Sequence, residues 1–458
     1  MARLRLGALS LVALLIIVAT PSSAGAALRK PDLSDTIARQ LPEDPFRLVG
    51  SDLNGDGNAD LTSVNWDSSI VSVLLSRGDG NFGKRVDYRA PQHPAGLAVA
   101  DVNGDGRPDL MTASHDRVGT VAVWLNGGSG RFVRAGTYEA GGFAWAVAAA
   151  DVNGDGVPDL LTAHHGKQQL AVLIGIGDGR FHGARRFAGR GARQLATGDL
   201  NRDGKLDVVL GTRGRTHVAV RLGGGDGSFG APRKYKVGFT DPGLAVADLN
   251  HDQILDLAVG GDSLVVMLGN GDGTFRVGWR AGDDVGGFGL DAVTVGDFNG
   301  DGNLDLLASG YPPDLLLGSG DGRFHTYEVD EEGAGVLDLD TFSGSPVAAD
   351  FNGDGRTDPA LLAFCDYDCD FGTVVLWLNW TGLPAKPCIV PDVTQYLPIG
   401  GALRDYGCRL GRVTHRYSRT VPRGWAISQS PKPEIVLPAF ARVDVVVSRG
   451  RRRHARGR

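Results

Sequence analysis

Asp101-Val102-Asn103-Gly104-Asp105-Gly106-Arg107-Pro108-Asp109 is one of seven copies of the nine-residue pattern D-x-N-x-D-x-x-x-D in this chain of 458 residues. The copies begin 48 to 53 residues apart, at Asp52, Asp101, Asp151, Asp199, Asp248, Asp297 and Asp350. Self-similarity at such a period indicates units that cannot bury their own hydrophobic face and must pack side by side. Most of the chain is therefore expected to be a repeat architecture.

One repeat contains the sequence signals of four strands. In the second copy, apolar stretches at 97–102 and 110–114 flank the aspartate loop, and further strands are expected at 120–125 and 132–138. A glycine turn at 128–130 separates the last two, because glycine supplies the positive φ that a tight hairpin needs. The turn recurs in five other copies, where a phenylalanine follows two residues later: Phe82, Phe181, Phe229, Phe275 and Phe324.

Seven such units predict an all-β fold, a seven-bladed β-propeller of four-stranded blades. A radial arrangement leaves only short, protected sheet edges. The composition agrees, because 69 glycines and only 7% aromatic residues suit many short strands joined by tight turns. The alternative is a parallel β-helix, but its coils are far shorter than this repeat.

The seventh copy departs from the others at its end. A third strand is expected at 373–378, but the sequence then runs into Pro384 without a glycine turn and phenylalanine. We expect part of residues 28–44 to supply the missing outer strand and close the ring, although Pro31 and Pro42 restrict where it can pair.

The nine-residue loop has oxygen donors at the spacing that calcium needs. Calcium takes six to eight oxygen ligands, here side chains at positions 1, 3, 5 and 9 and the backbone carbonyl of position 7. The first four predicted sites are Asp52, Asn54, Asp56, Asn58, Asp60; Asp101, Asn103, Asp105, Arg107, Asp109; Asp151, Asn153, Asp155, Val157, Asp159; and Asp199, Asn201, Asp203, Lys205, Asp207. The last three are Asp248, Asn250, Asp252, Ile254, Asp256; Asp297, Asn299, Asp301, Asn303, Asp305; and Asp350, Asn352, Asp354, Arg356, Asp358.

The loop has two other interpretations. An EF-hand needs glutamate at position 12, which no copy has. A metal-free turn rich in Asn, Asp and Gly is the second. Three carboxylates within each of seven loops would repel one another without a cation, which favours Ca²⁺ as the cofactor. Six copies have glycine at position 6 for the sharp bend, whereas the fifth has Gln253 and is expected to bind least well.

With these features, residues 45–385 resemble the FG-GAP or VCBS repeats of integrin-alpha-type propellers. The resemblance implies calcium loops on the lower face and ligand recognition by loops of the upper face. The upper face would then include Trp66, His93, His115, Trp145, His164, His165, Phe239 and Tyr311. Aromatic rings there could stack on sugars or anchor a protein, or Trp145 could pack at a blade junction and the histidines be solvated. Trp124 and Trp377 fall on third strands and are expected in the core.

After Pro384 the repeat stops, and the chain resembles a PASTA domain through 390–393, 406–408, 421–424 and 427–433. It ends, as that family does, in an alternating strand with Val443, Val445 and Val447. The resemblance implies a small α+β domain, with peptidoglycan or its fragments as possible ligands. The segment matching the family's helix, 397–406, is short and contains Pro398, so an irregular helix is expected.

The remaining features predict an exported protein. Arg3 and Arg5 precede an apolar run to Ala19, which indicates a signal peptide at 1–27, with an uncleaved anchor as the alternative. The domains expected are 1–27, a propeller at 28–385, a PASTA-like domain at 386–450 and a basic tail at 451–458. Four cysteines fit an oxidising compartment. Proximity favours Cys365 with Cys369 and Cys388 with Cys408 among three possible pairings.

These features favour a secreted calcium-binding adhesion or ligand-binding module, either free outside the cell or associated with the cell wall. The expected partner is a glycan, peptidoglycan or a protein; no nucleic acid, no transmembrane segment and a monomer are expected. A structural wall protein and a propeller-based enzyme are the alternatives, but no catalytic motif is present, so no enzyme is expected. The acidic loop 365–370 could form an eighth cation site or an exposed acidic turn. Asn379 begins a glycosylation sequon.

Overall fold

The computed structural model describes residues 35–41, 45–166, 168–281, 292–310, 313–326, 342–364, 373–379, 388–389, 409–416, 418, 420–421, 426–430, 436–437 and 442–448. Every regular element in these residues is a β-strand, and none of them forms a helix that could cross a membrane. The chain divides into two compact units, Met1–Thr381 and Gly382–Arg458. The predicted signal peptide, the basic tail and the loop 365–370 lie outside the described residues.

The first unit contains seven four-stranded antiparallel sheets in its described part. The first three consist of β2 (Pro45–Ser51), β3 (Asp60–Asn65), β4 (Ile70–Leu74) and β5 (Val86–Arg89); β6 (Pro94–Ala100), β7 (Asp109–Ser114), β8 (Thr120–Asn126) and β9 (Phe132–Glu139); and β10 (Ala144–Ala150), β11 (Asp159–His164), β12 (Gln168–Leu173) and β13 (Arg185–Ala188). The second of these sheets matches the four strands expected from the sequence to within a few residues.

The next three sheets consist of β14 (Ala192–Gly198), β15 (Asp207–Thr212), β16 (His217–Arg221) and β17 (Arg233–Lys236); β18 (Gly243–Ala247), β19 (Asp256–Gly260), β20 (Leu264–Gly269) and β21 (Phe275–Arg280); and β22 (Val293–Gly296), β23 (Asp305–Ala308), β24 (Asp314–Gly318) and β25 (Phe324–Thr326). The last sheet has the order β1 (Asp35–Gln40), β28 (Thr373–Leu378), β27 (Asp358–Phe364), β26 (Phe342–Ala349).

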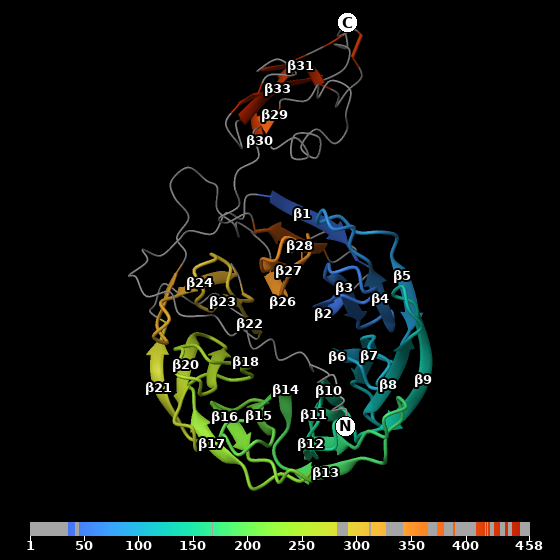
Figure 1. Cartoon of the computed structure of the whole chain (residues 1–458), viewed down its shortest axis with the longest axis vertical. Coiled ribbons are helices and arrows are strands. Elements are labelled where there is room, and N and C mark those ends of the chain that lie inside the picture. Colours follow the sequence, from blue (N-terminus) through green and yellow to red (C-terminus); the bar gives the residue numbers. More distant parts are fainter. Residues whose placement is uncertain are drawn as a thin grey trace, which may run out of the picture. The chain divides into compact units, whose positions relative to one another are not determined.

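The sheets stand around a common centre as the blades of a propeller (Figure 1). The first strand of each blade lies nearest the centre and the last lies outside. Strand β1 pairs antiparallel with β28, from Asp35 opposite Leu378 to Gln40 opposite Thr373, so a segment from the start of the chain completes the last blade. This confirms the expected closure and supplies the outer strand that the seventh copy lacks.

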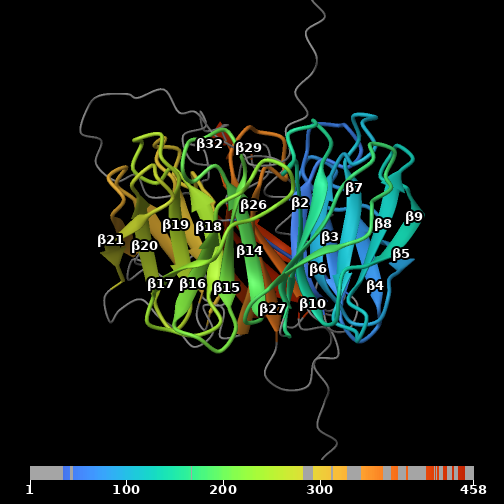
Figure 2. The ribbon, with the colours of Figure 1, turned by 90° about the horizontal axis from the view of Figure 1, so that it is seen from below.

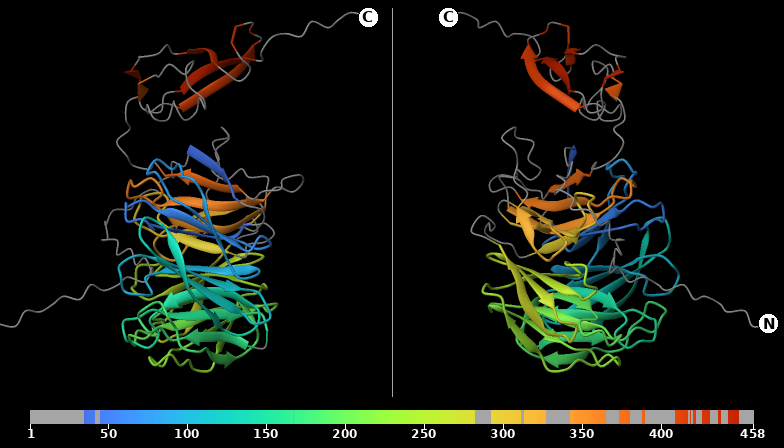
Figure 3. Two further views of the ribbon diagram at one scale, coloured as in Figure 1. Left: turned by 90° about the vertical axis from the view of Figure 1, so that its right-hand side faces the viewer. Right: turned by 60° about the vertical axis from the view of Figure 1, so that its left-hand side comes forward.

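Each blade has its aspartate loop at one end and its second-to-third-strand loop at the other. The loop follows the first strand and precedes the second, and these two strands are antiparallel, as β6 and β7 are from Pro94 opposite Ser114 to Ala100 opposite Asp109. The ring therefore has two opposite faces, on which the ends of the strands meet (Figures 2 and 3). We call them the aspartate-loop face and the strand-start face.

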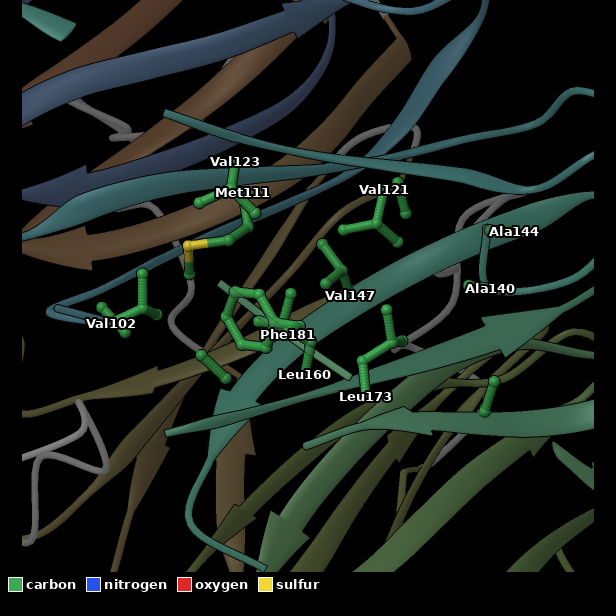
Figure 4. Packing of buried hydrophobic residues seen from close by; sticks show 14 residues of the cluster. Val102, Met111, Val121, Val123, Ala140, Ala144, Val147, Leu160, Leu173 and Phe181 are labelled. Carbon is green, nitrogen blue, oxygen red and sulfur yellow. The ribbon is translucent and has the colours of Figure 1, made fainter. Parts of the chain in front are cut away.

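Small residues line the inner strands because neighbouring strands approach closely at the centre. A Cβ atom added at Gly96 of β6 would lie 2.8 Å from the backbone nitrogen of Val147 in β10. The space between blades is filled by interlocking side chains. Met111 and Val123 of the second blade meet Val147, Leu160 and Phe181 of the third in one buried cluster (Figure 4).

At five junctions between blades, the recurring phenylalanine joins a blade to the one before it. Its ring packs against an aromatic residue in the outer strand of the preceding blade, as Phe275 does on Tyr235 with ring centroids 5.5 Å apart and planes at 86°. The same contact joins Tyr88 to Phe132, Tyr138 to Phe181, Phe187 to Phe229 and Trp279 to Phe324. Edge-to-face pairs of this kind are each worth about 0.5–1.5 kcal/mol beyond the area they bury.

The second unit is a separate small β-structure in its described residues. Strand β29 (Cys388–Ile389) pairs with β32 (Val436–Leu437). Strand β33 (Arg442–Ser448) lies between β30 (Arg409–Arg416), to which it is parallel, and β31 (Ala426–Ser430), to which it is antiparallel. The expected C-terminal strand is thus present, with Val445 buried. The predicted helix at 397–406 and the predicted disulfides fall outside the part that is described.

Candidate functional site

The aspartate loops fold around their first carboxylate. In the second blade, Asp101 Oδ1 accepts the N–H of Gly104 at 2.7 Å and Oδ2 accepts that of Gly106 at 2.7 Å. Asn103 Oδ1 accepts the N–H of Asp105 at 3.0 Å, and Asp105 Oδ1 accepts that of Arg107 at 3.0 Å. The oxygens at positions 1, 3 and 5 are therefore gathered inside one exposed loop, held there by its own backbone.

The aspartate at position 9 lies differently, because it is fully buried in every copy. One oxygen of Asp109 accepts the N–H of Val102 at 3.0 Å, and the other accepts that of Asn126 at 2.8 Å, where the third strand ends. The equivalent pair of hydrogen bonds is present in all seven loops of the described chain, made by Asp60, Asp109, Asp159, Asp207, Asp256, Asp305 and Asp358. Position 9 therefore joins the loop to the turn after the third strand.

Burial raises the pKa of these position-9 carboxyls, and the charges at positions 5 and 1 raise it further. The pKa is raised to about 6 at Asp60, Asp109 and Asp159, to about 7 at Asp256 and to about 8 at Asp305 and Asp358. The two backbone N–H donors act in the opposite direction but do not outweigh burial. A cation in the loop would relieve the repulsion among the three carboxylates.

The donor set of each loop fits a hard cation such as Ca²⁺, because it is made of oxygens alone. Each oxygen of a carboxylate has two lone pairs, so a hydrogen bond from the backbone still leaves one for a metal. In the described residues, no three carboxylate, imidazole or thiol side chains converge on one point. The loops therefore stand as Asx turns closed by hydrogen bonds from their own backbone.

Three loops depart from this arrangement. Gln253, where the other copies have glycine, keeps a φ of 64° and still donates its N–H to Asp248 at 2.8 Å. Positive φ is strained for a residue with a side chain. In the second and seventh loops an arginine at position 7 pairs with the position-5 carboxylate: Arg107 with Asp105, and Arg356 with Asp354 at 3.6 Å. These guanidinium groups supply a local positive charge where a cation would bind.

The loops are also fastened to the following blade. The carbonyl of position 2 accepts a glycine-turn N–H from the next blade at three loops, as Val102 does from Gly179 at 3.2 Å. Elsewhere a side chain of the next blade takes this role: Asn126 donates to Leu53, Asn379 to Phe298 and Ser76 to Phe351. Because Asn379 is fully buried in this contact, its amide is not presented for glycosylation, contrary to the sequence motif.

The opposite, strand-start face holds a cluster of aromatic, imidazole and guanidinium groups. Three of its members occupy the second position of a first strand: Phe46 in β2, Trp145 in β10 and Arg193 in β14. At each of these positions the pairing register skips one residue. A β-bulge of this kind turns a side chain out of the regular alternation. Here the three bulges direct the side chains of Phe46, Trp145 and Arg193 toward one site.

The rings of the cluster are in mutual contact. Trp66 follows the second strand of the first blade, and its ring lies 5.1 Å from Phe46, 5.5 Å from Trp145 and 5.3 Å from His93 between centroids. Trp145 stacks on His165 at 4.3 Å with planes 13° apart, and the Arg193 guanidinium carbon lies 4.9 Å from the Trp145 ring. Phe143 contacts His115 at 5.2 Å and remains 41% exposed.

A directed hydrogen-bond chain runs through the cluster. Arg193 Nε donates to His165 Nε2 at 2.8 Å, and His165 Nδ1 lies 3.0 Å from His115 Nε2. Because arginine can only donate, Nε2 of His165 carries no proton, and its neutral ring carries the proton on Nδ1. His165 therefore donates to His115, whose own proton lies on Nδ1. Asp241 lies 3.6 Å from Arg193 and anchors the start of the chain.

These surroundings keep both imidazoles neutral. Burial lowers the pKa of His165 to about 3, and the charges of Arg213 and Arg193 contribute. The pKa of His115 is lowered by burial and by His93, Arg213 and Arg193. The cluster also contains backbone strain, since His93, Phe143 and Asp241 adopt φ of 51°, 60° and 52°. Strained residues of this kind concentrate at binding and catalytic sites.

A cavity of about 160 Å³ lies among the first strands beside this cluster. Its walls include Arg47, Leu97, Gln194, Leu244, Val293 and Ser345. Arg47 connects it to the cluster, because its guanidinium carbon lies 6.0 Å from the Phe46 ring and its Nε donates to the carbonyl of Ala95 at 3.1 Å. With the Gln194 amide oxygen facing it, Arg47 Nη2 donates to that oxygen at 2.8 Å.

The structure gathers five of the eight residues predicted for the recognition face: Trp66, His93, His115, Trp145 and His165. The prediction was wrong for His164 and Phe239, because both side chains are buried in the interior. Tyr311 lies beyond the described residues. Trp124 is in the core, as expected, at 3% exposure. The sequence did not lead us to Phe46, Phe143 and Arg193. The feature that could have identified them is their position at or just before the start of a blade's first strand.

Comparison with known proteins agrees with this geometry. A family model described as FG-GAP-like repeat matches residues 52–112, 101–162, 199–259 and 248–308. Each match begins at the first aspartate of one loop and ends just past the next, so it spans one repeat. No curated protein matches the sequence. The repeats and the radial four-stranded sheets together define a β-propeller repeat protein.

The chain is similar to several solved structures. A structure described as BBS1N in complex with ARL6DN is 12% identical, covers 74% of this chain and 93% of its own, and has a TM-score of 0.50. A lectin of Agrocybe aegerita, described as recognising non-reducing terminal N-acetylglucosamine, is 22% identical over 63% and 79% of the chains, with a TM-score of 0.45. The periplasmic gluconolactonase PpgL of Pseudomonas aeruginosa is 18% identical over 62% and 84%, with a TM-score of 0.45. The first of these, at 12% identity, indicates a shared architecture and nothing about ligand.

Proposed function

We propose that this chain is a secreted, calcium-binding, seven-bladed β-propeller that acts as an adhesion or ligand-binding module. The observation that carries the proposal is the cluster around Trp66, Trp145 and His165 on the strand-start face. Bulged first strands direct its rings to one site, and Phe143 there is 41% exposed. Partly exposed aromatic groups beside a few oriented polar groups are the usual composition of a ligand site.

Calcium is proposed for the other face, where it would stabilise the loops. This proposal is supported by each loop's oxygens at positions 1, 3 and 5 and by the buried carboxyl at position 9, whose pKa is raised by burial and then by its charged neighbours. When bound, a divalent cation would neutralise these carboxylates. Asp101, Asn103, Asp105 and the carbonyl of Arg107 would hold it in the second loop, with Asp109 as the buried anchor beneath.

The C-terminal unit is proposed to assist or anchor the propeller as a PASTA-like domain. Its described strands, with β30 and β31 on either side of β33, are compatible with a small sheet of that kind. The ligand of the whole chain is then a glycan, peptidoglycan or a protein outside the cell. Export is proposed on the apolar stretch preceded by Arg3 and Arg5.

Binding rather than catalysis is proposed because the loop carboxylates are each committed to backbone N–H groups. The neutral imidazoles His115 and His165 are likewise committed to one another and to Arg193. A purely structural role would leave the exposed aromatic groups without a ligand, so the two functions differ in a direct binding experiment.

The test is retention of the purified protein on a glycan array and on purified peptidoglycan, with calcium and with EDTA. Phe143→Asn removes an exposed ring of the cluster while asparagine tolerates the φ of 60°. Its matched control is Ile176→Asn, which removes an exposed apolar side chain, 50% accessible, beside a glycine turn. We expect Phe143→Asn to reduce retention at least tenfold and the control to leave it unchanged. Absence of retention on every material in both conditions would overturn the proposal.

A further inference from the structure

The outer strands of three consecutive blades form a basic surface. Strand β13 carries Arg185 and Arg186, β17 carries Arg233, Lys234 and Lys236, and β21 carries Arg276, and all six side chains are exposed. We call these six residues the basic belt. Figure 1 shows β13, β17 and β21 following one another along the outside of the ring.

The charge of this region opposes that of the whole chain. Segments 178–190, 226–236 and 272–280 contain nine lysines and arginines against three aspartates, a net charge of +6, whereas the full chain has −6. Lysine and arginine on edge strands also prevent edge-to-edge pairing. The belt carries more positive charge than this protection requires. The equivalent outer segments of the first two blades, 79–89 and 129–139, are protected with only five basic against three acidic residues in total.

Four of the six belt charges are available for a partner. Arg233, Lys234, Lys236 and Arg276 form no ion pair within the described part of the chain. By contrast, Arg85, which directly precedes the outer strand β5 of the first blade, forms an ion pair with Asp87 at 2.9 Å. Each strand also lies near the glycine turn of the following blade, since Arg185 acts electrostatically on Asp226 and Arg233 on Asp272.

The aromatic residues of the same strands are not available for stacking. Phe187 packs on Phe229, Tyr235 on Phe275 and Trp279 on Phe324, so each ring is used between blades. Nucleobases of a single strand are normally held by such rings. A nucleic acid duplex is stiff over far longer distances than one protein, so bending it along the convex outside of the ring would cost free energy. Recognition by the belt must therefore be electrostatic and must suit a flexible chain.

We propose that the basic belt binds a flexible linear polymer that lacks bases and whose backbone charges are phosphates. Arginine and lysine both bind phosphate oxygens, and arginine does so through two parallel N–H groups. Alternate residues of a strand, such as Lys234 and Lys236, lie about 7 Å apart and point the same way, so successive phosphates of an extended chain can be engaged along one strand. This site is separate from the aromatic cluster and does not depend on its ligand.

The experiment measures binding of long-chain inorganic polyphosphate to the full chain, kept in calcium, as a function of salt. The test variant combines Arg233→Gln, Lys236→Gln and Arg276→Gln. The control combines Lys84→Gln, Arg85→Gln and Arg89→Gln, which removes the same charge from the first blade. We expect the test variant to bind about tenfold more weakly at low salt and to lower the slope of log affinity against log salt by about two.

The control is expected to retain the affinity and the slope of the unmodified protein. Equal weakening by both variants would overturn the proposal, because it would show a response to net charge rather than to the belt. Tighter binding of polygalacturonate or of single-stranded DNA than of polyphosphate would also overturn it. Thermal melting of each variant shows that the fold is retained.

Discussion

The imidazole of His165 lies flat on the indole of Trp145, with ring centroids 4.3 Å apart and planes 13° from parallel. The two residues belong to different strands of one blade: Trp145 is bulged out of β10, and His165 follows the end of β11. Arg193 of the next blade completes the group by bonding His165 and lying against Trp145. The strand-start face is thus organised by contacts within and between blades.

Calcium removal should destabilise the propeller. A site held at about ten times its dissociation constant gains roughly 1.4 kcal/mol by mass action, so several filled loops approach the stability of a typical domain. We expect excess EDTA to lower the melting temperature by many degrees, measured by calorimetry, and added calcium to restore it. A melt that EDTA leaves unchanged would contradict a structural role for the ions.

Two aspartates of one loop should respond differently to neutralisation. Asp109→Asn places an amide N–H₂ against a backbone N–H in the interior, which should cost about 2–3 kcal/mol of unfolding free energy even in EDTA. Asp105→Asn, in the exposed part of the same loop, should change the stability in EDTA little but weaken calcium binding. Chemical denaturation with and without calcium separates the two effects. If both variants lost the same unfolding free energy in EDTA, position 9 would have no structural role beyond that of position 5.

The fifth loop should be improved by a single substitution. Gln253→Gly relieves a φ of 64° at a side-chain-bearing residue, and we expect a gain of about 1 kcal/mol in unfolding free energy. The converse change, Gly106→Gln at φ of 80° in the second loop, should cost a similar amount. Urea unfolding of both variants measures the pair, and a loss of stability in Gln253→Gly would refute strain at this position.

Acidification should weaken the strand-start face. Burial lowers the pKa of His164 to about 4, and burial with the nearby arginines lowers that of His165 to about 3, against 6.5 in the unfolded chain. Below pH 6.5 these two histidines bind protons in the unfolded chain but not in the folded chain, so their contribution to the unfolding free energy falls as the pH falls, until the folded pKa is reached. The buried position-9 carboxyls, whose pKa is raised, act in the opposite direction.

This dependence is measurable by denaturation between pH 7.5 and 4.5. We expect His165→Gln to lose less unfolding free energy on acidification, or to gain more, than the unmodified protein, because one group that titrates only in the unfolded chain has been removed. His182→Gln, exposed on the outside of the third blade, is the control and should have the pH dependence of the unmodified protein. Identical slopes for His165→Gln and the control would contradict the low pKa of His165.

Much of the fold was predictable because its signals are local. The strands of the second repeat, the closure by an N-terminal segment and the burial of Trp124 all follow from alternation, glycine turns and the repeat period. The recognition face was less predictable. His164 and His165 are neighbours in sequence, yet one is buried and the other lies in the cluster, because successive residues at the end of a strand point to opposite sides.

The sequence by itself determined the seven repeats, the oxygen donors of their loops and the phenylalanine after each glycine turn, since these depend on residues close together in the chain. The tertiary structure alone decided which side chains meet. Bulges that bring Phe46, Trp145 and Arg193 to one site depend on strand pairing, and the burial of Asp109 depends on the turn after a distant strand. The basic belt is likewise a property of outer strands that only the ring places side by side.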